Sequence, residues 1–261
     1  MDMKVNDYMS KDVISVDKDD SLRHVMKLMK KHDVTKIPVL EEKKLIGITT
    51  DNIIAYKLGS KRKREVTAAR LHASSVIEKD FTAVKPDTKI QTVLKKVGEP
   101  GPTMLPVVEN EKLVGVLTKA DLLVLVNEKK AVHTIMQKNV HAVDPTDRVI
   151  HARHIMITEN VARLPVVKQG RLVGMISDKE IAFSLASIKR SFKLGRQKHQ
   201  LEELLVGDVM KIPAIWIPHN TSISAAAKVM IKQNVGALPI IQDDVITGII
   251  TRTDLLKTLS L

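Results

Sequence analysis

The amino-acid sequence predicts a mixed α/β (α+β) fold that repeats one β-α-β-β-α unit four times along its 261 residues. The first observation is an apolar residue, a proline and two further apolar residues, a pattern that recurs at Pro38, Pro106, Pro165 and Pro239. The second is a glycine nine residues after each proline, at Gly47, Gly115, Gly174 and Gly248. The third is a short β-branched run whose last residue lies 22 residues before each proline, at Val16, Val84, Val143 and Ile217. Seven residues before that residue stands a Met or an Ile, at Met9, Ile77, Met136 and Met210. All four copies keep these spacings without a gap, which chance agreement does not explain.

Each unit begins with a short strand, such as residues 13–16 or 81–84. A polar turn with helix-starting residues follows, and then a helix with apolar residues at three- and four-residue spacing, as in Leu22, Val25, Met26 and Met29. Pro-apolar-apolar begins a second strand at the proline, and a short polar loop leads to a third strand that ends in glycine-apolar-apolar-Thr/Ser. The last helix starts at Thr/Ser-x-x-acid, where the hydroxyl can cap it. Such a unit needs a neighbour to complete its core.

The composition is that of a folded globular protein, with 44% hydrophobic and 28% charged residues. The chain has no cysteine, which excludes disulfides, thiolate metal sites and a cysteine nucleophile. Among the longest apolar runs is residues 122–126, far short of a membrane span. The first residues lack the basic and apolar regions of a signal peptide. We therefore expect a cytoplasmic protein with no membrane association.

The net charge of +12 is concentrated in two stretches. Residues 57–72 and residues 187–200 each carry a net charge of +5, and the rest of the chain is nearly balanced. These basic linkers could bind nucleic acid or an acidic partner. The simpler interpretation is that they are solvated connecting segments.

The repeated unit resembles the CBS (cystathionine-β-synthase) domain in its length, its Pro-Val-apolar strand and its Gly-apolar-apolar-Thr-x-x-Asp-Leu ending. The resemblance covers nearly the whole chain, as repeats 1 to 4 at residues 5–57, 72–126, 131–186 and 204–260. CBS domains usually work in pairs, called Bateman modules, so four repeats imply two modules, repeats 1 with 2 and repeats 3 with 4. The arrangement is similar to the gamma subunit of AMP-activated protein kinase, which implies a flat disk. The sequence leaves open whether one chain forms that disk or a homodimer is needed.

The resemblance implies clefts for adenosine-type ligands, with AMP, ADP or ATP expected and no cofactor required. In the family the acid of Thr/Ser-x-x-Asp binds the ribose hydroxyls, and the hydroxyl residue lies near the ribose and phosphate. Repeat 2 matches with Thr118 and Asp121, and repeat 4 with Thr251, Thr253 and Asp254. Repeat 3 has Ser177 with the longer acid Glu180. Repeat 1 has Thr50, but Ile53 stands at the acid position and Asp51 is displaced, so whether it binds anything is left open.

A second set of candidates lies two residues before each proline, where the kinase gamma subunit has basic residues that reach phosphates. Lys36 and Arg163 occupy this position in repeats 1 and 3, whereas repeats 2 and 4 have Met104 and Ala237. Arg252 is a further candidate for phosphate binding. Instead of binding a ligand, the cations could lie on a solvated strand edge, and the hydroxyl and acid residues could cap helices.

No nucleophile elbow, P-loop, dinucleotide fingerprint or zinc-protease helix is present, so we expect no enzyme activity in this chain. The favoured function is a regulatory adenine-nucleotide sensor that modulates a protein partner of unknown identity. The alternatives are a nucleic-acid-binding or S-adenosylmethionine-binding CBS protein acting through the basic linkers, and a purely architectural module.

Overall fold

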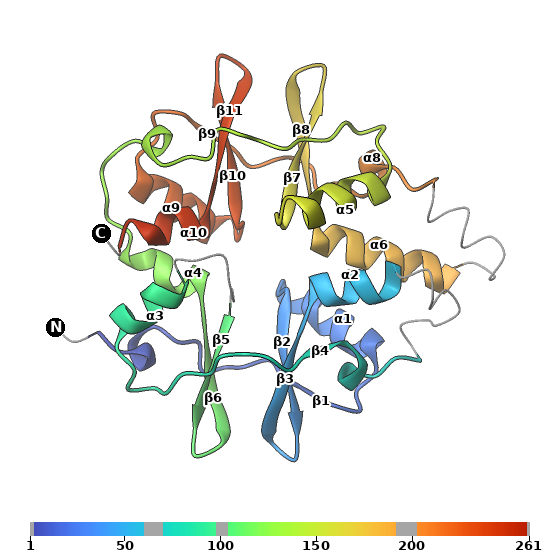
Figure 1. The fold of residues 1–261 in the computed structure, drawn as a ribbon, viewed down its shortest axis with the longest axis vertical. Helices are drawn as coiled ribbons and strands as arrows, with labels where there is room; N and C mark the ends of the chain where they lie inside the picture. Colours follow the sequence, from blue (N-terminus) through green and yellow to red (C-terminus); the bar gives the residue numbers. More distant parts are fainter. Residues whose placement is uncertain (1–2, 60–69, 98–103, 192–202, 260–261) are drawn as a thin grey trace. The chain divides into compact units, whose positions relative to one another are not determined.

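The computed structural model describes residues 3–59, 70–97, 104–191 and 203–259. The chain divides into two compact units (Figure 1). Unit 1 comprises residues 1–13, 81–140 and 215–261, and unit 2 comprises residues 14–80 and 141–214. Repeats 2 and 4 therefore lie mainly in unit 1, and repeats 1 and 3 mainly in unit 2. Each unit thus combines one repeat from each predicted pair.

Unit 2 contains two copies of the predicted order of elements. Repeat 1 forms β1 (Val16–Asp17), α1 (Leu22–His32), β2 (Lys36–Glu41), β3 (Lys44–Thr50) and α2 (Asp51–Gly59). Repeat 3 forms α5 (Val149–Thr158), β7 (Arg163–Lys168), β8 (Arg171–Ser177) and α6 (Asp178–Ser191). The segments that begin repeats 2 and 4 add η3 (Ala73–Val76), β4 (Ile77–Glu78) and α8 (Val206–Val209).

Unit 1 has the same organisation. Repeat 2 forms α3 (Ile90–Val97), β5 (Met104–Glu109), β6 (Lys112–Thr118), α4 (Lys119–Leu122) and η4 (Leu123–Leu125). Repeat 4 forms β9 (Ile217–Pro218), α9 (Ile223–Lys232), β10 (Ala237–Gln242), β11 (Val245–Thr251) and α10 (Arg252–Lys257). The segments that begin repeats 1 and 3 add η1 (Val5–Asp7) and η5 (Val132–Thr134).

The second and third strands of every repeat form an antiparallel hairpin in one shared register. The proline is the third residue of its strand, so the strand begins two residues earlier than the sequence predicts. Each hairpin turns through two residues with positive φ: Glu42 and Lys43, Asn110 and Glu111, Gln169 and Gly170, Asp243 and Asp244. Tight turns of this kind match the right-handed twist of the flanking strands. The β-branched landmarks pair in parallel with the residue after each proline: Val16 with Val39, Val84 with Val107, Val143 with Val166, Ile217 with Ile240.

The segment that begins each repeat packs on the other repeat of its pair. We call residues 5–10, 73–78, 132–137 and 206–211 the exchanged segments. Their Met or Ile landmarks contact the landmark glycines: Met9 at Gly115, Ile77 at Gly47, Met136 at Gly248 and Met210 at Gly174. A Cβ at Gly115 or Gly174 would lie 2.6 or 2.7 Å from the methionine Sδ, closer than two such atoms can approach. The landmark glycines are therefore required by close packing, and repeats 1 and 2, like repeats 3 and 4, complete each other.

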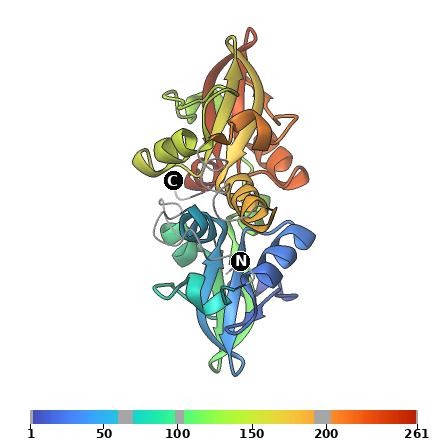
Figure 2. The ribbon, with the colours of Figure 1, turned by 90° about the vertical axis from the view of Figure 1, so that its right-hand side faces the viewer.

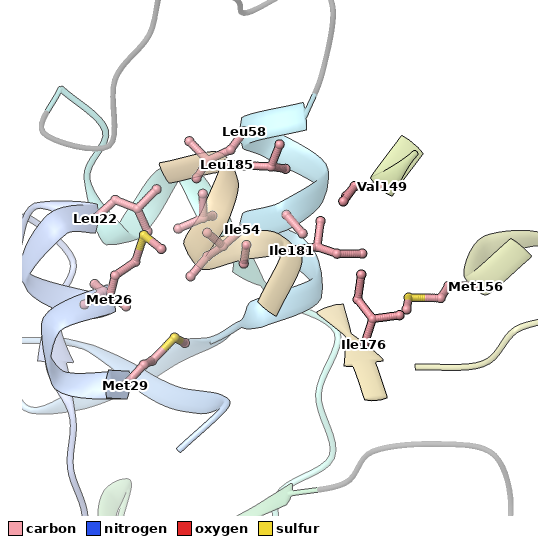
Figure 3. Close-up of a cluster of buried hydrophobic side chains, with 14 of the residues drawn as sticks. Leu22, Met26, Met29, Ile54, Leu58, Val149, Met156, Ile176, Ile181 and Leu185 are labelled. Atoms are coloured by element: carbon pink, nitrogen blue, oxygen red, sulfur yellow. The ribbon is translucent and has the colours of Figure 1, made fainter. Parts of the chain in front are cut away.

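Each unit has its own hydrophobic core, which its two repeats share. In unit 2, helices α2 and α6 pack against each other (Figure 1 and Figure 2). Ile54 and Leu58 of α2 meet Ile181 and Leu185 of α6, with Met26 of α1 nearby (Figure 3). In unit 1, the core joins α3, η4, α9 and α10. Aliphatic and methionine side chains form the buried part of both cores, in a sequence with only three Phe, two Tyr and one Trp.

No helix in the part of the chain that the structure describes is long and apolar enough to span a bilayer. The flat disk that the resemblance implies stays a prediction.

Candidate ligand-binding site

The hydroxyl and acid residues of unit 1 form capping boxes where the third strand meets the last helix. Thr118 is the N-cap of α4, and Asp121 Oδ2 accepts hydrogen bonds from Thr118 N and Thr118 Oγ1, both at 2.7 Å. Thr251 is the N-cap of α10, and Asp254 Oδ2 accepts from Thr251 N at 2.8 Å and from Thr251 Oγ1 at 2.7 Å. Thr118 with Asp121 and Thr251 with Asp254 therefore cap helices, and a ligand would have to use the second oxygen of each carboxylate.

The same two positions differ between the repeats of unit 2. In repeat 3, Glu180 Oε2 accepts from Ser177 N at 3.0 Å and from the Ser177 hydroxyl, so the longer acid still closes the cap. In repeat 1, Thr50 Oγ1 accepts from Ile53 N at 3.2 Å, and no carboxylate completes the cap. The Asp51 carboxylate instead accepts from Asn52 N at 3.0 Å.

The second carboxylate oxygen of each unit 1 acid faces an exchanged segment. Ser10 Oγ donates to Asp121 Oδ1 at 3.5 Å, and Gln137 Nε2 donates to Asp254 Oδ1 at 3.3 Å. Both bonds are longer than usual and therefore weak. Asp121 Oδ1 and Asp254 Oδ1 thus keep acceptor capacity that a ligand hydroxyl can use.

Lys36 and Arg163 belong to one charged group in unit 2, which we call the charge cluster: Lys36, Asp51, Arg163, Asp178 and Glu180. Lys36 interacts electrostatically with Asp51 and Asp178, and Arg163 with the same two acids and Glu180. Burial lowers the pKa of both cations, and the nearby carboxylates oppose this effect. The structure therefore places the two predicted phosphate-binding residues, from repeats 1 and 3, beside a shared set of acids.

Asp178 is a buried acid of the charge cluster whose pKa is raised. Its side chain is buried, and burial, followed by repulsion from Asp51, raises its pKa from 3.8 to about 6. Asn52 Nδ2 donates to Asp178 Oδ2 at 3.0 Å, which partly offsets the shift. Burial also raises the pKa of Asp51, and Lys36 opposes this shift.

Register explains why these residues meet. Lys36 pairs with Thr50, the residue before Asp51, and Arg163 pairs with Ser177, the residue before Asp178. The sequence interpretation missed Asp178 and Asn52. The signal was available, because the residue after the hydroxyl is acidic in repeats 1 and 3 and basic in repeats 2 and 4.

Unit 1 replaces this cluster with a different arrangement. Met104 and Ala237, which stand at the cation position, are buried. Lys119 is also buried, and its Nζ donates to Thr253 Oγ1 at 2.7 Å. Arg252 reaches back within its own repeat, where its Nε donates to the carbonyl of Val235 at 3.2 Å and a terminal nitrogen to Asn234 Oδ1 at 3.3 Å. Thr253 and Arg252 are thus engaged by the protein itself.

Most of the two basic linkers, at residues 60–69 and 192–202, lies outside the described residues. Within the described residues, no group of three or more His, Asp or Glu side chains is arranged to hold a metal ion.

Comparison with known proteins finds four matches to one family along the chain. The family model of the CBS domain matches residues 5–59, 73–128, 132–187 and 206–261. Protein MJ1404 of Methanocaldococcus jannaschii is 26% identical over 97% of this chain, which spans 61% of that protein. Protein MJ1225 of the same organism is 24% identical over 95% of both chains. The inosine-5'-monophosphate dehydrogenase of Korarchaeum cryptofilum is 32% identical over 42% of this chain and 24% of the enzyme.

Solved structures show the same fold. The crystal structure of MJ1225, described as a proposed archaeal homologue of the gamma subunit of AMP-activated protein kinase, superposes with a TM-score of 0.84 and 21% identity. The superposition covers 98% of this chain and all of the other. A conserved protein from Pyrococcus horikoshii superposes with a TM-score of 0.62, again over 98% of this chain.

Proposed function

The chain belongs to the CBS domain family, and from this premise we propose that it is a regulatory sensor of adenine nucleotides such as AMP, ADP or ATP. Ligand binding changes how it contacts a protein partner, and the chain has no catalytic activity of its own. The likeness to MJ1225 supports the four-repeat form of such a sensor. The dehydrogenase relative shares less than half of this chain, which fits a regulatory rather than a catalytic common part.

The observation that carries the proposal is the state of the acids in unit 1. In Asp121 and Asp254 the cap fixes one carboxylate oxygen, and only a long hydrogen bond engages the other. A vicinal diol donates two hydrogen bonds, and a carboxylate that is already held in place accepts them without losing side-chain freedom. Asp121 and Asp254 are therefore suited to ribose hydroxyls.

Unit 2 offers the complementary chemistry. Lys36 and Arg163 are desolvated cations, and an entering phosphate would compete with Asp51 and Asp178 for them. A charge-assisted hydrogen bond contributes on the order of 1.5–3 kcal/mol, so a phosphate beside these cations would be favoured over an uncharged group. Unit 1 therefore supplies acceptors for a ribose diol, and unit 2, taken by itself, supplies donors for a phosphate.

Isothermal titration calorimetry with AMP, ADP, ATP and S-adenosylmethionine tests this proposal. The double variant Asp121→Asn, Asp254→Asn should weaken nucleotide binding at unit 1 by about tenfold or more. The matched control is Asp208→Asn, since Asp208 caps α8 in the same way, outside the Thr/Ser-x-x-acid motifs. Wild-type protein that binds none of the nucleotides would refute the proposal. Preference for S-adenosylmethionine would replace it with the alternative ligand.

Nucleic-acid binding through residues 57–72 and 187–200 is the second candidate, because these residues carry ten of the twelve net positive charges. Gel shifts at several salt concentrations with an RNA and a DNA duplex would detect it. Reversal of the charges at residues 61–64 should then weaken binding, and unchanged binding would exclude that patch.

A further inference from the structure

The residue that follows each Met or Ile landmark in an exchanged segment holds a fixed place beside the third strand of the partner repeat. Ser10 pairs with Val116, Glu78 with Ile48, Gln137 with Ile249 and Lys211 with Met175. Each of these strand residues lies two positions before the capping hydroxyl. The four places are therefore structurally equivalent.

In unit 1 this place faces the acid of the partner repeat. Ser10 Oγ lies 3.5 Å from Asp121 Oδ1, and Gln137 Nε2 lies 3.3 Å from Asp254 Oδ1. By the same register, Lys211 and Glu78 hold the equivalent places in unit 2, beside the strands that lead to Glu180 and Ile53. The four facing pairs differ in composition, yet each pair contains one carboxylate. In three pairs the last helix provides it, and in repeat 1 the exchanged segment does.

The strand register also places Glu78 on the same face of the sheet as the cation of repeat 1. Cross-strand partners share a face, as do residues two apart on one strand. Lys36 pairs with Thr50, and Ile48 pairs with Glu78 on its other side, so all four side chains lie on one face. Ile37 and Ile77, on the opposite face, contact the core of unit 2. Glu78 is exposed and attracts the Lys36 ammonium electrostatically.

We propose that Glu78 supplies the carboxylate that the last helix of repeat 1 lacks, so that repeat 1 binds a ribose-type vicinal diol beside Lys36. This inference rests on the proposed nucleotide-sensing function and adds a site to it. A carboxylate from the exchanged segment makes the site dependent on both repeats of the pair. The ligand class is a ribonucleoside phosphate, with the diol on Glu78 and the phosphate toward Lys36.

The test isolates repeat 1 by replacing the other three acids with amides of the same shape. The full chain carrying Asp121→Asn, Glu180→Gln and Asp254→Asn is titrated calorimetrically with AMP and with 2′,3′-dideoxy-AMP. This triple variant, the background for the test, should bind one AMP per chain. Its affinity for the dideoxy analogue should be lower than its affinity for AMP by about tenfold or more. Adding Glu78→Gln should lower the AMP affinity by a similar factor and abolish the preference for the diol. Adding Asp80→Asn instead, a nearby exposed acid, should change neither quantity.

Two results would overturn the inference while the proposed function stands. One is wild-type binding of AMP with no binding by the background variant. The other is a background variant whose affinity and diol preference survive Glu78→Gln. Absence of AMP binding by wild-type protein would instead remove the proposed function, and this inference with it. If the background variant is not folded by circular dichroism, Glu78→Gln in the wild-type chain should reduce the number of AMP bound by one, and an unchanged number would overturn the inference.

Discussion

Asn52 Nδ2 donates a hydrogen bond to Asp178 Oδ2 at 3.0 Å, and this bond joins repeat 1 to repeat 3 inside unit 2. Asp178 is the first residue of α6, and Asn52 is the second residue of α2. In unit 1 the first residue of α4, Lys119, donates to the second residue of α10, Thr253, at 2.7 Å. In both units the first residue of one last helix is therefore hydrogen-bonded to the second residue of the other last helix. That first residue is an acid in unit 2 and a base in unit 1.

Stability should depend on pH through Asp178. Its pKa is about 6 in the folded protein and near 3.8 in the unfolded chain, so the folded state binds its proton more tightly. This stabilisation is complete below pH 3.8 and is lost as pH rises through about 6. Between pH 5 and pH 8, wild-type protein should lose about 1–2 kcal/mol relative to Asp178→Asn, measured by urea unfolding. A constant difference between the two proteins would contradict the assignment.

The landmark glycines should differ in their tolerance of alanine. A Cβ at Gly47 would lie 2.7 Å from the carbonyl oxygen of Glu78, whereas at Gly115 it would meet the side chain of Met9. Backbone cannot move aside as a methionine can, so Gly47→Ala should cost about 1–3 kcal/mol and Gly115→Ala less. Adding Met9→Ala should relieve the Gly115→Ala clash. Thermal unfolding checks the order, and equal costs at the two glycines would refute it.

Lys36 and Arg163 should discriminate a nucleotide from its nucleoside. We expect Lys36→Met and Arg163→Met each to weaken AMP binding by about tenfold, because a charge-assisted bond to phosphate is lost, and to leave adenosine binding unchanged. Lys112→Met removes an exposed charge at the start of β6 and serves as the control. Equal losses for AMP and adenosine would point to a structural role for the cations.

The shared core of unit 2 should couple its two repeats. Ile54→Ala removes a fully buried side chain and should cost about 2–5 kcal/mol. Because α2 packs on α6, hydrogen exchange should accelerate in α6 as well as in α2. Leu255→Ala, in the core of unit 1, is the matched control and should accelerate exchange in α10 and α9. If Ile54→Ala accelerated hydrogen exchange in α2 alone, the result would contradict a core that the two repeats share.

The repeat and its elements could be predicted from the sequence because several landmarks have a cause inside one repeat. Val16 pairs with the residue after Pro38 inside the same repeat, and the Thr or Ser hydroxyls cap the helices that follow them. The antiparallel hairpins follow from strands separated by polar turns. These features depend on residues close together in the chain.

The remaining features depend on which distant segments meet. The spacing of Met9 and Gly115 was visible, but their contact joins residues more than a hundred positions apart, and periodicity does not show it. In the sequence Asp51 is displaced from the acid position of its repeat, and the structure places it near Lys36 and Arg163. That neighbourhood depends on repeat 3 packing against repeat 1, and the pattern inside one repeat does not predict it.

The exchanged segments also determine when, during synthesis of the chain, each repeat can complete its packing. When the ribosome has made repeat 1, the edge of β3 has no partner until Ile77 and Glu78 emerge. Residues 5–10 wait longer, because the residues that they contact include Gly115, Val116 and Asp121, which are made much later. At ~5–20 residues per second the delay is several seconds, during which an unpaired strand edge is open to aggregation. A nascent chain of this protein therefore has most need of chaperone protection before residue 115 emerges.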